Sequence, residues 1–147
     1  MVVDVAQLIA SDRKEIELLF SEFEVTSGKE AKAILIKRLC SALRMHRMAE
    51  ENLIFPELDF EDELFVPKIR EEHEVLNYFI EELSRCSGDE ENLDCKVKVL
   101  AEFFRHHVLT EEREVLDKLN DEQDASDSLS RKWTDFKNEH SEQALSN

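Results

Sequence analysis

The chain has 147 residues, enough for one domain that buries a core without the support of disulfides or a metal. Its 19 basic and 35 acidic residues give a net charge of -16, which argues against nucleic acid or an anionic membrane surface as a partner. No apolar run approaches the roughly 20 residues that a membrane-spanning helix needs. Only two glycines and two prolines interrupt the chain, so long helices are expected.

Helix-breaking residues divide the chain into four long segments with helical periodicity. The first expected helix covers about 4–24 and ends near Gly28, a plausible C-terminal cap. The second covers about 29–55 and is ended by Pro56. An acidic connector leads to Pro67, which suits the first turn of a third helix that ends near Gly88, and a fourth covers about 91–120. Each segment has one apolar face, so the pattern predicts an all-α, up-down-up-down four-helix bundle over residues 4–120.

The remaining residues, 121–147, are polar and rich in serine and aspartate. Within them Leu129, Trp133 and Phe136 recur at helical spacing. An exposed stripe that contains an indole ring is an aggregation liability, so we expect a short fifth helix that docks on the bundle. A frayed polar tail is the alternative.

The apolar faces of the second and fourth helices each contain a histidine and a glutamate. These faces consist of Leu39, Leu43, His46, Glu50 and Leu53, and of Val97, Leu100, Phe104, His107 and Glu111. Residues four apart lie on the same side of a helix, about 6 Å apart along its axis. A buried carboxylate costs several kcal/mol unless it is paired or coordinates a metal. Two such carboxylates beside two imidazoles therefore favour a metal ion between them.

The two motifs also belong to an internal repeat. His46 and His107, which begin the two His-x-x-x-Glu-Glu motifs, are 61 positions apart. The first helix aligns on the third at nearly the same offset, and there the pair Glu72-His73 matches Asp12-Arg13. Each half should therefore contribute a histidine from its first helix, but the first half has Arg13 at that position.

These motifs resemble those of the hemerythrin-like (HHE cation-binding) domain. The matching features are the stretch HRMAEENLIFP in the second helix, Glu72-His73 in the third and HHVLTEE in the fourth, within about residues 4–120. The resemblance implies a non-haem di-iron centre with bridging carboxylates, and a protein that binds or senses O2, nitric oxide or peroxide, or handles iron. The metal ligands that it implies are His46, Glu50, His73, His107 and Glu111. Such ligands suit iron but also Zn or Mn.

Arg13 departs from this pattern, because a guanidinium is charged at any relevant pH and cannot bind a metal. Three outcomes are open: a di-iron centre completed by water or a nearby carboxylate, a single metal, or no metal. Asp12 and Glu17 are candidates for that carboxylate. Alternatively, Arg13 pairs with Glu50 or Glu111 and replaces the second cation. We expect an intact but asymmetric metal centre, because the other five positions persist.

Several other polar residues are expected to face solvent. His106 lies about 100° around the helix from His107. Glu51 and Glu112 are turned outward in the same way, and His140 belongs to the polar tail. None of these four is predicted as a ligand.

The favoured hypothesis is a cytoplasmic non-haem iron protein that binds or senses O2 or a related small oxidant. The three cysteines (Cys40, Cys86 and Cys95) are an odd and widely spaced set, which fits free thiols in a reducing cytosol, and the N-terminus lacks the basic region of a secretory signal. A dry pocket for the ligand is expected from Phe20, Phe79 and Phe104. The alternative is a regulatory or interaction bundle whose metal is structural or absent. An oxidase or peroxidase ranks last, since no further acid–base group accompanies the ligands.

Overall fold

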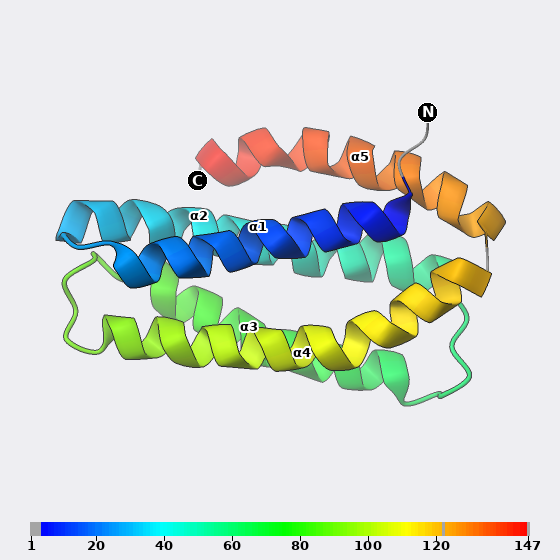
Figure 1. Cartoon of the computed structure of the whole chain (residues 1–147), viewed down its shortest axis with the longest axis horizontal. Coiled ribbons are helices and arrows are strands. Elements are labelled where there is room, and N and C mark those ends of the chain that lie inside the picture. Colours follow the sequence, from blue (N-terminus) through cyan, green and yellow to red (C-terminus); the bar gives the residue numbers. More distant parts are fainter. Residues whose placement is uncertain (1–3, 122, 147) are drawn as a thin grey trace.

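The structure, a computed structural model, describes residues 4–121 and 123–146 (Figure 1). Within that part, the side chains of residues 112, 123–126 and 141–146 are not described. The five α-helices are α1 (Val5–Val25), α2 (Lys29–Ala49), α3 (Phe65–Ser84), α4 (Leu93–Asp121) and α5 (Gln123–Ser146). No strand occurs among the described residues, so the all-α prediction is confirmed.

Helices α1 to α4 alternate in direction and form the predicted up-down-up-down bundle (Figure 1). Helix α5, orange in Figure 1, runs along α1 and α2 on the side away from α3. In the described part of the chain, no helix is both long and apolar enough to cross a membrane.

The end of α2 differs from an ordinary α-helix. The chain continues from α2 into a π-helical turn at Glu50–Ile54 and a 3-10 turn at Phe55–Glu57, so the helical segment ends next to Pro56 as predicted. The N–H group of Phe55 donates to the carbonyl oxygen of Glu50, which is the wider spacing of a π turn. Such turns alter the direction in which side chains leave a helix and are frequent at functional sites.

The third helix begins at Phe65, slightly before the predicted start. Pro67 therefore lies in its first turn, where a missing N–H group costs nothing. At the start of α1, the Asp4 carboxylate accepts a hydrogen bond of 3.1 Å from the N–H group of Ala6.

The core consists of two apolar clusters, which the buried polar residues separate. One cluster contains Phe20, Leu43, Leu76, Leu100 and Phe104 among others, and the second contains Val5, Ile9, Ile54, Ile69 and Val115 among others. Along each of the helices α1 to α4, the buried acid or histidine stands between the residues of the two clusters. The bundle thus holds a polar layer in an interior that is otherwise apolar.

Helix α5 completes the second cluster. Leu129, Trp133 and Phe136 are buried against residues of α1, α2 and α4, which confirms that this stripe docks on the bundle. The helix spans Gln123–Ser146 and is therefore longer than the short helix that the spacing suggested. The helix is stable over this length because its apolar face buries three large side chains, although the composition of the segment is otherwise polar.

Two glycines, one directly before α2 and one in the loop between α3 and α4, provide a matched test of the fold. Gly28 and Gly88 both have positive φ, of 102° and 104°. A Cβ atom on Gly88 would collide with the backbone carbonyl of Lys29, whereas one on Gly28 meets nothing within 4 Å. We expect Gly28→Ala to cost about 1–2 kcal/mol of unfolding free energy, from the unfavourable φ alone. Gly88→Ala should cost about 1–3 kcal/mol more, from the collision. Urea denaturation of both variants measures the difference, and equal costs would contradict the close approach.

Candidate metal centre

The five ligands that the resemblance implies all lie in the buried polar layer. His46 and Glu50 come from the end of α2, His73 from α3, and His107 and Glu111 from α4. Each is at most 4% exposed. Glu50 is the first residue of the π-helical turn.

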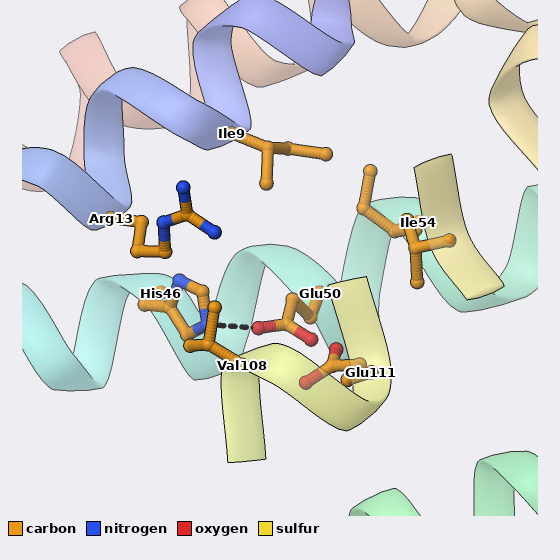
Figure 2. Close-up of a pocket in the computed structure, with 8 residues that line it drawn as sticks. Ile9, Arg13, His46, Glu50, Ile54, Val108 and Glu111 are labelled. Carbon is orange, nitrogen blue, oxygen red and sulfur yellow. Dashed lines mark ion pairs between the residues drawn. The ribbon is translucent and has the colours of Figure 1, made fainter. Parts of the chain in front are cut away.

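Four of these residues converge on one point. One possible ligand atom from each of His46, Glu50, His107 and Glu111 lies within 4.8 Å of the others. Nε2 of His46 contacts Oε1 of Glu50 (Figure 2), and Nε2 of His107 lies 2.6 Å from Oε2 of Glu111. His73 stands beside this group, with Nε2 3.9 Å from Oε2 of Glu50.

The atoms that face this point have no hydrogen-bond partner among the described residues. They are Nε2 of His46, His73 and His107, both carboxylate oxygens of Glu50, and Oε2 of Glu111. Several are close to one another, but not in the geometry of a hydrogen bond. Buried polar atoms without a partner are costly and rare in folded proteins. A cation where His46, Glu50, His107 and Glu111 converge would satisfy atoms of these four residues, and imidazole nitrogen with carboxylate oxygen is a donor set that fits iron, zinc or manganese.

Carboxylates outside the group fix the orientation of two imidazoles. Nδ1 of His73 lies 3.1 Å from Oε1 of Glu51, and Nδ1 of His107 lies 2.6 Å from Oε2 of Glu72. An ionised carboxylate can only accept, so Nδ1 carries the proton in both rings. In the neutral ring, Nε2 then presents its lone pair to the centre, which is the arrangement found for histidines that bind metals.

The imidazole of His46 also has a carboxylate beside its Nδ1 atom, but at a longer distance. Nδ1 of His46 lies 3.4 Å from Oδ2 of Asp12, a buried carboxylate on α1. The contact is an ion pair rather than an aligned hydrogen bond, because neither atom meets the geometric requirements of one. Asp12 is also paired with Lys137 of α5. Helix α5 thus reaches the candidate centre through one intervening carboxylate.

These contacts bear out the internal repeat in three dimensions. Asp12 on α1 approaches His46 on α2, and Glu72 on α3 approaches His107 on α4. The acid and the ring occupy matching positions in the two helix pairs. The residue that follows Asp12, Arg13, is the counterpart of His73 in the sequence repeat.

Arg13 lines a small cavity next to the candidate ligands. Figure 2 shows its guanidinium group turned toward the space between α1 and the glutamates. The cavity has a volume of about 20 Å³, which is room for about one water molecule. Its lining consists of Ile9, Arg13, His46, Glu50, Ile54, Val108, Glu111 and Val115.

The lining corrects one expectation about the apolar pocket. No phenylalanine lines this cavity, whose apolar walls are isoleucine and valine side chains. The Phe104 ring instead packs edge-on against the His46 ring at 5.4 Å, with Phe20 behind it at 6.1 Å. Phe79 packs against Phe103. Helical periodicity identified these rings as buried but could not show which side of the ligand layer they cover.

The charges at the site set the protonation of its imidazoles. Burial by itself lowers the pKa of His46, but Glu50 and Asp12 outweigh burial and raise this pKa to about 10. Burial lowers the pKa of His107 below its ordinary value. The two carboxylates therefore favour the protonated form of His46, whereas burial favours the neutral form of His107. A metal ion that binds His46 has to displace this proton, which makes binding dependent on pH.

The structure corrects the expectation for Glu51. Instead of facing solvent, its carboxylate is half-buried between Nδ1 of His73 and the guanidinium of Arg47, at 3.1 Å from each. Glu51 lies within the π-helical turn, where the regular 100° step per residue does not apply. The expectation assumed a regular α-helix and was therefore wrong.

The other polar residues lie as follows. His106 is exposed, as expected, and His140 is half-buried, with its ring stacked on Phe136 at 4.1 Å. Glu17, a candidate substitute ligand, instead pairs with Arg105 at 3.0 Å. The side chain of Glu112 lies outside the described residues.

Sequence reasoning missed the role of the outer carboxylates. Asp12 and Glu72 occupy equivalent positions of the repeat, and both fall on apolar stripes, which was the available signal. No comparable signal pointed to Lys137, because its contact with Asp12 joins residues 125 positions apart.

Comparison with known proteins agrees with this geometry. The family model of the hemerythrin HHE cation-binding domain matches residues 5–119, which are most of the chain. The searches of curated proteins and of solved structures found no significant match. The matched range contains all five candidate ligands, and the His/Glu group in the structure could hold a metal ion. The chain belongs to the hemerythrin HHE cation-binding family.

Proposed function

We propose that the protein is a non-haem iron protein that binds or senses O2 or a related small oxidant such as nitric oxide or peroxide. The metal ligands in this proposal are His46, Glu50, His73, His107 and Glu111. The observation that carries it is the buried set of ring nitrogens and carboxylate oxygens that face one point without hydrogen-bond partners among the described residues. Membership in a cation-binding family supports the same conclusion.

The surrounding residues have distinct roles in this proposal. Glu51 and Glu72 hold the rings of His73 and His107 so that Nε2 faces the centre, and Asp12 does the same, less tightly, for His46. When bound and reduced, iron with an open coordination position supplies reversible binding of O2 or a similar molecule.

The size and lining of the small cavity favour a small ligand. Ile9, Ile54, Val108 and Val115 form apolar walls directly beside the carboxylates. A volume of about 20 Å³ is room for about one water molecule, which suits a ligand as small as O2. The proposal also places the protein in the cytoplasm, because Cys40, Cys86 and Cys95 are free thiols.

Metal content and visible spectra test the proposal. The full chain should be expressed with ample iron, purified without oxygen, and analysed for iron, zinc and manganese per chain. We expect iron to be bound and the visible absorption of the reduced protein to change when O2 or nitric oxide is added. Removal of the oxidant should restore the first spectrum if binding is reversible.

Two outcomes would contradict the proposal. A colourless protein that takes up no divalent metal after iron-replete expression would show that the site is degenerate. Bound metal with a spectrum that is indifferent to O2, nitric oxide and peroxide would favour the alternative of a regulatory or interaction bundle with a structural metal.

A further inference from the structure

We infer that Arg13 occupies the place of a second metal ion, so that the centre holds one metal ion per chain. This inference rests on the proposed function, because it concerns the composition of the same centre. It makes Arg13 the residue that determines the number of bound ions, and three features of the structure support it.

The first feature is the register of the two halves. The contact between Asp12 and His46 repeats the contact between Glu72 and His107, so the two helix pairs match at these two positions. His73 directs Nε2 toward Glu50. Its counterpart Arg13 is directed into the cavity that Glu50 and Glu111 line (Figure 2). A symmetric centre would need an imidazole where this guanidinium lies.

The second feature is the convergence of the remaining donors. His46, Glu50, His107 and Glu111 come from both halves, yet their ligand atoms lie within 4.8 Å of one another. Ligand atoms about 2.0–2.2 Å from one shared ion are at most about 4.4 Å apart, close to this spread. His73 adds a fifth donor beside Glu50. One ion can therefore use the four converging donors.

The third feature is charge and space beside Arg13. The guanidinium keeps its positive charge at every relevant pH and faces the same glutamates that would have to bind a second cation. Like charges repel strongly in a poorly solvated interior. The space that remains, about 20 Å³, is room for about one water molecule. The guanidinium therefore supplies a positive charge beside Glu50 and Glu111, where a second ion would otherwise bring one.

Metal stoichiometry provides the test. The full-length protein and the variants Arg13→His, Arg13→Gln and Lys14→His are titrated with iron(II) without oxygen, and iron per chain is measured after removal of unbound ion. We expect one ion in the wild type and two in Arg13→His. Lys14→His adds an imidazole at the neighbouring, exposed position of α1 and is the matched control, with one ion expected. Arg13→Gln removes the charge without adding a ligand and should also bind one.

Electron paramagnetic resonance gives a second readout after oxidation. A single ferric ion gives a signal that accounts for all the iron, whereas two coupled ferric ions give little or none. We expect the full signal from the wild type and its loss in Arg13→His.

The outcomes separate this inference from the proposed function. Two ions in the wild type would overturn the inference and leave the iron protein intact. One ion in a folded Arg13→His variant, as judged by circular dichroism, would also overturn it. If that variant does not fold, a ferric signal that accounts for only a small part of the iron in the wild type would overturn it just as clearly. No bound ion in the wild type would overturn the proposed function itself, and the inference with it.

Discussion

Replacement of Glu111 by glutamine is expected to lower the affinity of the protein for iron(II) by more than about 100-fold. Glutamine preserves the shape of the side chain but removes the negative charge from a residue that is only 3% exposed and belongs to the converging group. Loss of an outer partner of a metal ligand typically costs about 10- to 100-fold in affinity, and loss of a charged ligand should cost more. Anaerobic titration with iron(II), against a chelator of known affinity, measures the change.

Glu114→Gln is the matched control for this prediction. Glu114 lies on the same helix but is exposed, so the identical chemical change should leave the affinity nearly unaltered. Equal affinities of the Glu111→Gln variant and the wild type would show that Glu111 does not bind the metal. An equal loss in both variants would point to the net charge of the protein instead of the centre.

The variant Trp133→Ala is expected to lower the free energy of unfolding by about 3–5 kcal/mol. Trp133 is 2% exposed and belongs to the apolar cluster that joins α5 to the bundle. The same cluster contains Ile9 and Ile54, which line the cavity beside the candidate ligands. Removal of the indole leaves a void that the neighbouring helices cannot fill. Urea denaturation of the metal-free protein, followed by circular dichroism, measures the effect.

Leu109→Ala provides the comparison, because Leu109 is 71% exposed on α4. Its truncation should change the free energy of unfolding by no more than about 0.5 kcal/mol. If Trp133→Ala costs as little as this control, α5 does not contribute to the stability of the bundle and its docking is wrong.

The architecture of the bundle could be predicted because its signals are local. Each helix shows its inner face by apolar residues at helical spacing, and Gly28, Pro56 and Pro67 lie close to the ends of helical segments. Gly28, however, directly precedes α2, and Thr26 takes the predicted place at the end of α1. Helix α5 was likewise predicted, although not its full length, from the apolar stripe of Leu129, Trp133 and Phe136. In each case the residues that carry the information are near neighbours along the chain.

The contacts around the imidazoles could not be predicted in the same way. Glu51 was assigned to solvent because a regular helix would turn it outward, but a π-helical turn begins at Glu50 and brings Glu51 to His73. Lys137 reaches Asp12 only because α5 lies along α1. Both outcomes depend on how separate segments pack, and packing is set by many contacts at once.

The sequence by itself determined that His46, Glu50, His73, His107 and Glu111 belong to inner faces, and that Arg13 stands where the repeat expects histidine. Only the tertiary structure decided that four of the five converge on one point and that Arg13 lines the cavity beside them. Periodicity fixes the direction of a side chain around its own helix axis. It leaves open the distances between helices, and these distances decide what a ligand set can hold.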